Sequence, residues 1–268
     1  MKRRDFLCST AFVSTGLIFV PKRLAAQSIS VLTAPGAATI ASKKAVAGGG
    51  GGGGGDTTTG QIAWWKLDDG SGTTPVDSSG TGNNGTFVGS PTWTTGHIGG
   101  GLSFNGSTQY VTAATTGMGS LTTATLAAWM NRSSTGNQVS LGAGSNSTND
   151  RFTFQWFTDG NCYFTFGNGS GIQYAFCAAN VTGWHHFAMV FDGSQTGNAR
   201  IVAYIDGVLK TLTYNTTPPS SLSSSASLGN FVMGTNANLS GNSTGIVDDV
   251  RFYNVAKNAT DIAALAAM

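Results

Sequence analysis

The hydrophobic positions beyond residue 60 fall into short runs that glycine, serine, threonine and asparagine separate at close intervals. Several runs alternate apolar and polar residues, which is the pattern of a strand with one buried face. Many short strands with turn residues between them predict an all-β fold, a sandwich of two antiparallel sheets. The runs that we expect to be strands are 62–67, 102–104, 109–112, 125–130, 139–141, 151–157, 162–166, 172–177, 185–191, 200–205, 208–214, 226–233 and 245–253.

One segment near the end of the chain, residues 258–266, has the pattern of a short helix instead. Asn258 is a favourable N-cap residue, and Asp261 stands three residues later, where the helix N-terminus stabilises a carboxylate. The sequence therefore predicts a sandwich with a short C-terminal helix.

The first 26 residues have the parts of a bacterial export signal: a basic start, an apolar stretch over 6–20, and small residues at 25–26. Arg3 and Arg4 followed by Phe6 and Leu7 resemble a twin-arginine signal, and an ordinary secretory leader is the alternative. Both predict an exported protein, in the periplasm, on the cell surface or secreted. The apolar stretch is shorter than the roughly 20 residues that span a bilayer, so we expect no membrane span in the mature chain.

Residues 27–59 consist mainly of alanine, serine, threonine and glycine, with eight consecutive glycines at 48–55. Such a segment buries too little apolar surface to offset its ordering entropy, so it is predicted to be a flexible linker. The glycine run lacks the Gly-Lys-Ser/Thr ending of a phosphate-binding loop. The folded domain is then expected over residues 60–268.

The charged residues narrow the possible functions. They make up 10% of the chain, and all twelve acidic residues are aspartates, without any glutamate. Removal of the leader leaves nine basic and eleven acidic residues. A weakly acidic body without a basic cluster lacks the electrostatic pattern of nucleic-acid binding, so we expect no nucleic-acid partner.

Two cysteines, Cys162 and Cys177, lie in adjacent predicted strands that the loop 168–171 joins. Symmetrical folding of this hairpin places them directly opposite each other, with Cα atoms roughly 4.5 to 5.5 Å apart. A disulfide accepts this distance, and an exported protein meets an oxidising environment, so we expect a disulfide. Two buried free thiols are the alternative.

Seven segments, in order along the chain, resemble the laminin G-like and concanavalin A-like domains of bacterial surface and secreted proteins. The resemblance covers residues 62–265 and implies a jelly-roll sandwich, a fold that includes lectins, enzymes and adhesion modules. The segments are 65–72 (WKLDDGSG), 77–86 (DSSGTGNNGT), 101–111 (GLSFNGSTQYV), 125–129 (TLAAW), 183–188 (GWHHFA), 204–208 (YIDGV) and 245–254 (GIVDDVRFYN).

The resemblance also implies a structural Ca²⁺ ion, the only cofactor that we expect. Its ligands would be Asp248 and oxygens near Asn105-Gly106 and Asp68, since calcium prefers oxygen ligands. The acidic residues that the family has after Gly106 are replaced by residues 107–109, Ser-Thr-Gln. In the alternative interpretation, Asp248 and Asp249 pair with an arginine or cap a turn.

Catalysis is disfavoured, so we expect that the chain is not an enzyme. Related glycosidases use a Glu-x-Asp-x-Glu strand, and no Gly-x-Ser-x-Gly motif precedes a helix. Asp248 and Asp249 are neighbours on a strand and are expected to face opposite sides. The same argument separates His185 from His186, and His97 is expected in an exposed loop, so no zinc site is predicted.

Binding of a carbohydrate is the leading functional hypothesis. Alternation puts Tyr163 and Tyr174 on the hairpin face opposite the cysteines, and Arg151 and Gln155 on the face of their strand opposite an apolar row, Phe152, Phe154 and Trp156. These four side chains are predicted to hold a glycan. In the alternative interpretation the two tyrosines cover the core with their hydroxyls in water. A structural or adhesive module that contacts a cell-surface protein is the second hypothesis, and a glycosidase-like enzyme is the third.

Overall fold

The computed structural model describes residues 55–144, 150–169, 173–237, 239 and 241–268. The predicted export signal and most of the predicted linker lie outside the described residues. Of the helices in the described ranges, none combines the length and the apolar character that a bilayer crossing requires.

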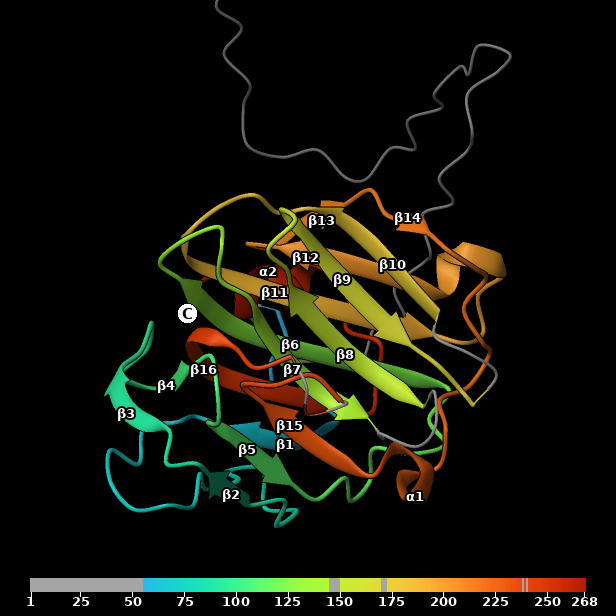
Figure 1. Ribbon diagram of the computed structural model, residues 1–268. Helices are drawn as coiled ribbons and strands as arrows, with labels where there is room; N and C mark the ends of the chain where they lie inside the picture. The colour runs from blue at the N-terminus through green and yellow to red at the C-terminus, as the bar shows by residue number, and fades with distance from the viewer. Residues whose placement is uncertain (1–54, 145–149, 170–172, 238, 240) are drawn as a thin grey trace, which may run out of the picture. The chain divides into compact units, whose positions relative to one another are not determined.

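The described residues form two stacked antiparallel sheets, so the predicted sandwich is confirmed (Figure 1). Sheet A has the order β13-β12-β11-β6-β16-β4-β3, with β1 also paired to β16, and sheet B has the order β14-β10-β9-β8-β7-β15-β5-β2. The strands of sheet A are β1 (Gln61–Trp65), β3 (Thr92–Thr95), β4 (Gly100–Asn105), β6 (Thr123–Arg132), β11 (Gly183–Asp192), β12 (Ile201–Ile205), β13 (Val208–Lys210) and β16 (Thr244–Tyr253). The strands of sheet B are β2 (Gly85–Val88), β5 (Tyr110–Ala113), β7 (Val139–Gly144), β8 (Arg151–Trp156), β9 (Asn161–Phe166), β10 (Gln173–Ala178), β14 (Thr213–Tyr214) and β15 (Asn230–Met233).

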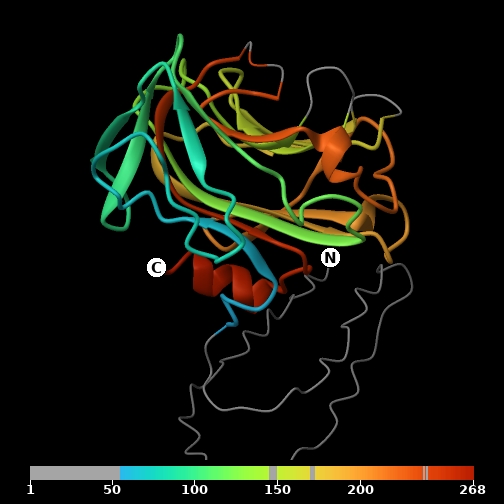
Figure 2. The same cartoon turned by 90° about the horizontal axis from the view of Figure 1, so that it is seen from below.

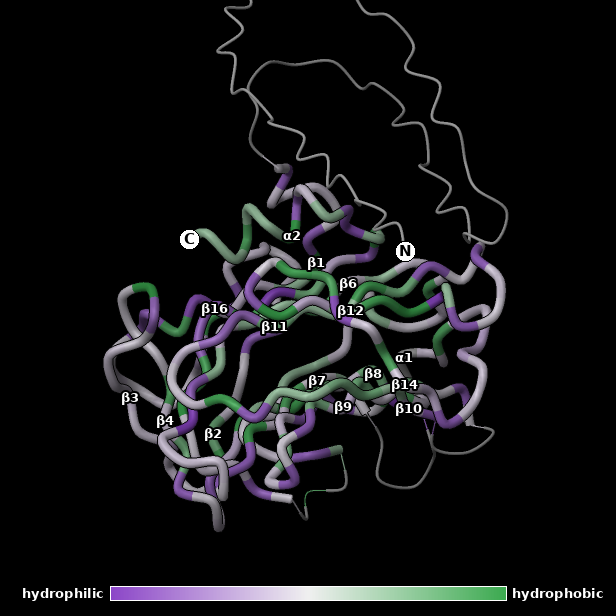
Figure 3. Tube along the Cα trace, turned by 90° about the horizontal axis from the view of Figure 1, so that it is seen from above, coloured by the Kyte–Doolittle hydropathy of each residue, from purple (hydrophilic) through white to green (hydrophobic). Residues whose placement is uncertain are grey.

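The core lies between the two sheets, because each strand turns alternate side chains inward. On β8, Phe152, Phe154 and Trp156 are fully buried, as their spacing predicts. On β6 of the facing sheet, Leu126 and Met130 are fully buried as well. Figure 2 shows the two layers from the side, and Figure 3 shows that the apolar stretches follow the strands of both layers.

Two expected strands differ from the structure, and the structure has two short strands that were not expected. Residues 208–214 form two short strands, β13 and β14, which belong to different sheets. The segment 226–233 begins as the short helix α1 (Ser225–Leu228) and becomes β15 only after Gly229, whose φ of 68° turns the chain. Strands β2 and β3 were not predicted, because they have four residues each and few apolar ones.

The C-terminal helix α2 (Ala259–Leu265) begins with the predicted cap. The Asn258 side chain accepts hydrogen bonds from the backbone amides of Thr260 and Asp261, and the Asn258 backbone amide donates to the Asp261 carboxylate. Ile262 and Leu265 are fully buried against Tyr253 and its neighbours, so α2 covers part of the outer face of sheet A (Figure 2).

Residues 55–59, the described part of the predicted linker, also contact this covered region. The Asp56 amide donates to Asp261 at 2.7 Å, and the Tyr253 hydroxyl donates to the Thr57 carbonyl at 2.8 Å. The chain therefore joins the sandwich on the outer side of sheet A.

The β9–β10 hairpin has the predicted register, since Cys162 pairs directly with Cys177. The predicted disulfide is wrong for this structure, in which both cysteines are buried free thiols. Burial raises the pKa of Cys177 to about 11 and raises that of Cys162 as well. Because thiol oxidation proceeds through the thiolate, burial in the core disfavours bond formation even between paired residues.

Candidate functional site

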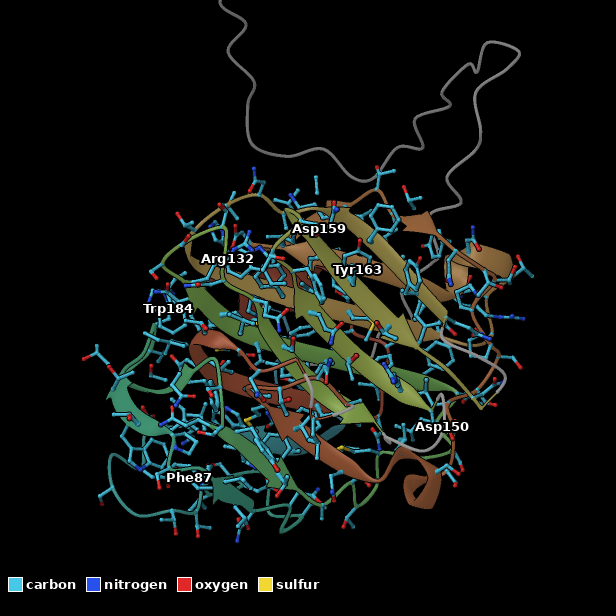
Figure 4. All side chains as sticks on the ribbon, viewed as in Figure 1. Phe87, Arg132, Asp150, Asp159, Tyr163 and Trp184 are labelled. Carbon is cyan, nitrogen blue, oxygen red and sulfur yellow. The ribbon has the colours of Figure 1, made fainter. Side chains whose placement is uncertain are left out.

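The outer face of sheet B carries a pocket of about 380 Å³. Cross-strand pairing of Gln155 with Tyr163, and of Thr165 with Tyr174, sets the residues of β8, β9 and β10 side by side. The pocket is lined by Arg151, Gln155, Phe157, Thr158, Asp159, Tyr163, Thr165 and Tyr174. All four residues predicted to hold a glycan therefore lie in one pocket. Figure 4 labels two of its residues, Tyr163 and Asp159.

Four partly exposed aromatic rings gather on this face, and Tyr163 is at their centre. Its ring centroid lies 5.4 Å from that of Phe176, 5.6 Å from that of Tyr174 and 5.7 Å from that of Phe157. These rings combine apolar faces with two hydroxyl groups, a combination suited to a ligand that is partly apolar and partly polar. We call Phe157, Tyr163, Tyr174 and Phe176 the aromatic platform.

The Tyr163 hydroxyl is fixed by Asp159. It donates to the Asp159 carboxylate at 2.7 Å, and the Asn161 backbone amide donates to the same carboxylate at 2.9 Å. Burial alone would raise the pKa of Asp159, but the bonds from Tyr163 and Asn161 outweigh it and lower that pKa. The bond to Asp159, followed by burial, raises the pKa of Tyr163. The pair is thus an ionised carboxylate and a neutral phenol at neutral pH.

Three other polar side chains of the pocket, those of Gln155, Thr158 and Tyr174, have no hydrogen-bond partner among the described residues. Arg151 begins β8 and Asp159 follows its end, so the positive and the negative side chain stand at opposite ends of the pocket. Burial lowers the pKa of Arg151. Asp159 is the single carboxylate among the described residues that line the pocket.

The residues expected to bind calcium do not come together in one site. Oδ2 of Asp248 accepts the amides of His97 and Ile98, each at 2.8 Å, and Oδ1 of Asp68 accepts the amide of Gly100. Asn105 lies opposite Thr244, four residues from Asp248 along β16. Its Oδ1 caps the turn after Asn105, accepting the amides at 107 and 108, and Gly106 packs beside Thr244.

These positions do not form one ligand set for a calcium ion: Oδ2 of Asp248 and Oδ1 of Asp68 accept amides within residues 97–100, and Asn105 caps a different turn, four residues away along β16. Nor do the described residues contain any other group of three or more His, Cys, Asp or Glu side chains suited to a metal. The alternative interpretation matches the structure: Asp248 caps a turn, and Asp249 pairs with Arg251 at 3.0 Å.

The turn between β3 and β4, residues 96–99, folds over the outer face of sheet A. His97 lies in this loop and is exposed, as expected, and its ring stacks on that of Trp129 with centroids 3.5 Å apart. The cause is a close approach that only glycine allows. A Cβ atom at Gly96 would lie 2.6 Å from the Asp248 carboxylate, and one at Gly101 would lie 2.9 Å from Gly96.

A β-bulge corrects the expectation that Asp248 and Asp249 face opposite sides. The register of β16 against β6 shifts between Asp248 and Arg251, and Asp249 has a φ of 47°. Asp249 consequently accepts bonds from Trp64 and Arg251 on the outer face, while Asp248 lies beside Trp129 on that same face. Alternation along a strand does not predict such a bulge.

Asp248, Trp129 and His186 form one row across β16, β6 and β11 beneath this turn. Each has a buried polar atom without a hydrogen-bond partner among the described residues: Asp248 Oδ1, Trp129 Nε1 and His186 Nδ1. Burial raises the pKa of Asp248 to about 7 and lowers the pKa of His186 to about 3. Both groups are therefore held in or near their neutral forms.

Two large antiparallel sheets, with an aromatic and polar pocket on one outer face, define a concanavalin A-like jelly roll. The sequence profile of the concanavalin A-like lectin/glucanases superfamily matches residues 105–263, more than half of the chain. The chain belongs to this family, which confirms the resemblance drawn from its motifs. No curated protein matches it in sequence.

Two of the solved structures with a similar fold are binding domains of toxins. The receptor-binding domain of the botulinum neurotoxin C/D mosaic serotype has a TM-score of 0.58 and 12% identity, over 78% of this chain and 51% of that one. The binding domain of botulinum neurotoxin DC in complex with rat synaptotagmin II has a TM-score of 0.58 and 13% identity, over 79% and 52%. This chain thus spans about half the length of the toxin domains.

A third structure is domain 4 of AbnA, a GH43 extracellular arabinanase from Geobacillus stearothermophilus, in complex with arabinotriose. Its TM-score is 0.52 and its identity 19%, over 77% of this chain and 98% of that one. At such identities the similarity to all three shows the fold.

Proposed function

We propose that this chain is an exported, non-catalytic module that binds a carbohydrate in the pocket on the outer face of sheet B. The observation that carries the proposal is the aromatic platform beside polar groups that the protein itself leaves unpaired. Sugar rings have apolar C–H faces and hydroxyl edges. The rings of Tyr163 and Tyr174 suit the faces, and the Gln155 amide suits the edges.

The arabinotriose complex of the arabinanase domain supports a saccharide as the ligand of this fold. Export from a bacterium, proposed from residues 1–26, agrees with a polysaccharide ligand outside the cell. The described part of residues 27–59 joins the sandwich on the side of sheet A, so the pocket of sheet B faces away from the point of attachment.

The test is binding of the purified chain to a panel of neutral oligosaccharides: arabino-, xylo-, cello-, manno- and galacto-oligosaccharides, measured by titration calorimetry. We expect saturable binding of at least one member, and an affinity about tenfold lower in Tyr174→Ala and about fivefold lower in Gln155→Ala. Tyr110→Ala is the matched control, since Tyr110 lies on β5 of the same sheet outside the pocket. Equal effects of Tyr110→Ala and Tyr174→Ala would place the ligand elsewhere.

A protein partner is the second candidate, and one observation favours it: a domain of this fold binds rat synaptotagmin II. Competition separates the two functions, because a soluble saccharide displaces a lectin-like module from a cell surface and leaves a protein-binding module in place. Retention at the surface in the presence of every saccharide of the panel would support the protein partner.

A further inference from the structure

A second open polar surface lies on the outer face of sheet A. Ser103, Ile246, Asn131 and Trp184 stand in register on β4, β16, β6 and β11, so their side chains form one row across four strands. We call these four residues the open row. It lies next to the row that residues 96–99 cover, and all four members remain partly exposed.

The open row borders a small pocket of about 220 Å³. None of the side chains that line it is charged; the lining residues are Ser103, Phe104, Asn131, Ser133, Thr244, Gly245 and Ile246. The Ser103 and Thr244 hydroxyls and the Asn131 amide make no side-chain hydrogen bond to any described residue. Three uncommitted polar groups thus surround the apolar side chain of Ile246.

Trp184 supplies an aromatic ring beside this pocket. It is directly opposite Asn131 on the next strand, and its ring centroid lies 5.9 Å from that of His97. His97 in turn stacks on Trp129, so the residues around Trp184 are fixed by packing. Figure 4 labels Trp184 at the left of the molecule.

We infer that the open row is a second saccharide site, specific for neutral sugar units. Hydroxyl and amide groups around an apolar floor, with an indole at one side, match a sugar ring and its hydroxyls. The absence of charged lining residues disfavours uronic acids and phosphorylated sugars, which would lose hydration without gaining an ionic partner. Because the two pockets lie on the outer faces of different sheets, one chain can hold two polysaccharide strands at once.

The arrangement of the two pockets predicts a property that neither has alone. A bivalent chain cross-links a soluble polysaccharide and binds it more tightly than either pocket does, by the effective concentration of the second site. A chain with a single site binds without cross-linking.

The experiment is a nuclear magnetic resonance titration of the full chain with the panel of neutral oligosaccharides. We expect shifts of the Asn131 side-chain amide and the Trp184 indole, both in the wild type and in Tyr174→Ala. Asn131→Ala should lower the affinity reported by the Trp184 signal about fivefold, and Trp184→Phe should lower it less. Asn180→Ala is the matched control, because Asn180 is an exposed asparagine that lines neither pocket.

The outcomes separate this inference from the proposed function. Shifts of Asn131 and Trp184 that persist in Tyr174→Ala support the second site, even where the pocket of sheet B binds nothing. The inference is wrong if no saccharide of the panel shifts either signal, or if Tyr174→Ala abolishes the shifts. Light scattering with a long polysaccharide completes the test: the concentration of chain needed for cross-linking should rise in Tyr174→Ala and in Asn131→Ala, and cross-linking unchanged in Asn131→Ala would contradict bivalency.

Discussion

The polar side chains on the outer faces of the two sheets differ in whether the chain itself supplies their hydrogen-bond partners. On sheet A, helix α2 and residues 96–99 cover part of the face, and Asp248 and Asp249 accept bonds from the chain's own amides, indole and guanidinium groups. On the pocket of sheet B, Gln155 and Tyr174 keep their polar side-chain atoms unpaired and accessible. Carboxylates that are bonded within the chain thus mark the covered part of sheet A, and neutral groups without partners mark the two surfaces that are open to a ligand, the sheet B pocket and the open row.

The largest expected effect is a loss of stability when helix α2 packs less well on the outer face of sheet A. Ile262→Ala removes a fully buried side chain of α2, and we expect the free energy of unfolding to fall by about 2 to 4 kcal/mol. Urea denaturation measures this loss. Thr260→Ala, at an exposed position of the same helix, should change it by less than about 0.5 kcal/mol. Saccharide affinity of the sheet B pocket should be the same in both variants; a parallel loss of affinity would show that the two faces are coupled.

The buried row beneath residues 96–99 should give two opposing pH dependences of stability. The raised pKa of Asp248 favours folding at low pH, so its contribution is lost as the pH rises from about 4 to about 7. The lowered pKa of His186 has the opposite sign: its neutral form is favoured in the folded state, and stability is lost as the pH falls from about 6.5 to about 3. Between about pH 4 and 6.5 the two contributions largely cancel.

Substitutions separate these contributions. Asp248→Asn should leave only the contribution of His186 to the pH dependence. The free energy of unfolding then rises with pH between about 4 and 6.5, by at most about 1.4 kcal/mol per pH unit. His186→Phe should leave only the contribution of Asp248, so that the free energy of unfolding falls as the pH rises over the same range. Denaturant midpoints measured across this range test both. Slopes of the same sign in the two variants would contradict the burial of one of the groups.

The open face should respond in affinity more than in stability. Tyr163→Phe keeps the aromatic ring and removes the hydroxyl that binds Asp159, so we expect saccharide affinity to fall about fivefold. The pKa of Asp159 should rise at the same time, because it loses one of the hydrogen bonds that lower it. Carboxyl chemical shifts measure this pKa. Tyr110→Phe, outside the pocket, should change neither quantity; unchanged affinity in Tyr163→Phe would limit the role of this residue to its ring.

Local patterns predicted the open face better than the covered one. Strict alternation on β8, β9 and β10 sufficed to bring Arg151, Gln155, Tyr163 and Tyr174 together, because no bulge interrupts these strands. The motifs of the family predicted the sandwich, and Asn258 together with Asp261 predicted the C-terminal helix. The shared face of Asp248 and Asp249 and the stacking of His97 on Trp129 depend on a bulge and on glycine packing between distant segments, which the alternation of a single strand does not show. The glycines at 96 and 99–101 were the signal for that close approach.

The smallest expected effect is that of calcium: we expect it to leave the melting temperature unchanged. Oxygens of Asp68, Asn105 and Asp248 already accept backbone amides, and Asn105 stands at the far end of the strand pairing from Asp248. An ion that binds Oδ2 of Asp248 would have to displace the amides of His97 and Ile98, which would unstack His97 from Trp129. Thermal unfolding with millimolar calcium and with chelator tests this. A calcium-dependent rise that Asp248→Asn abolishes would mean that residues 96–99 open to admit the ion, and the face described here as covered would then be a metal-dependent one.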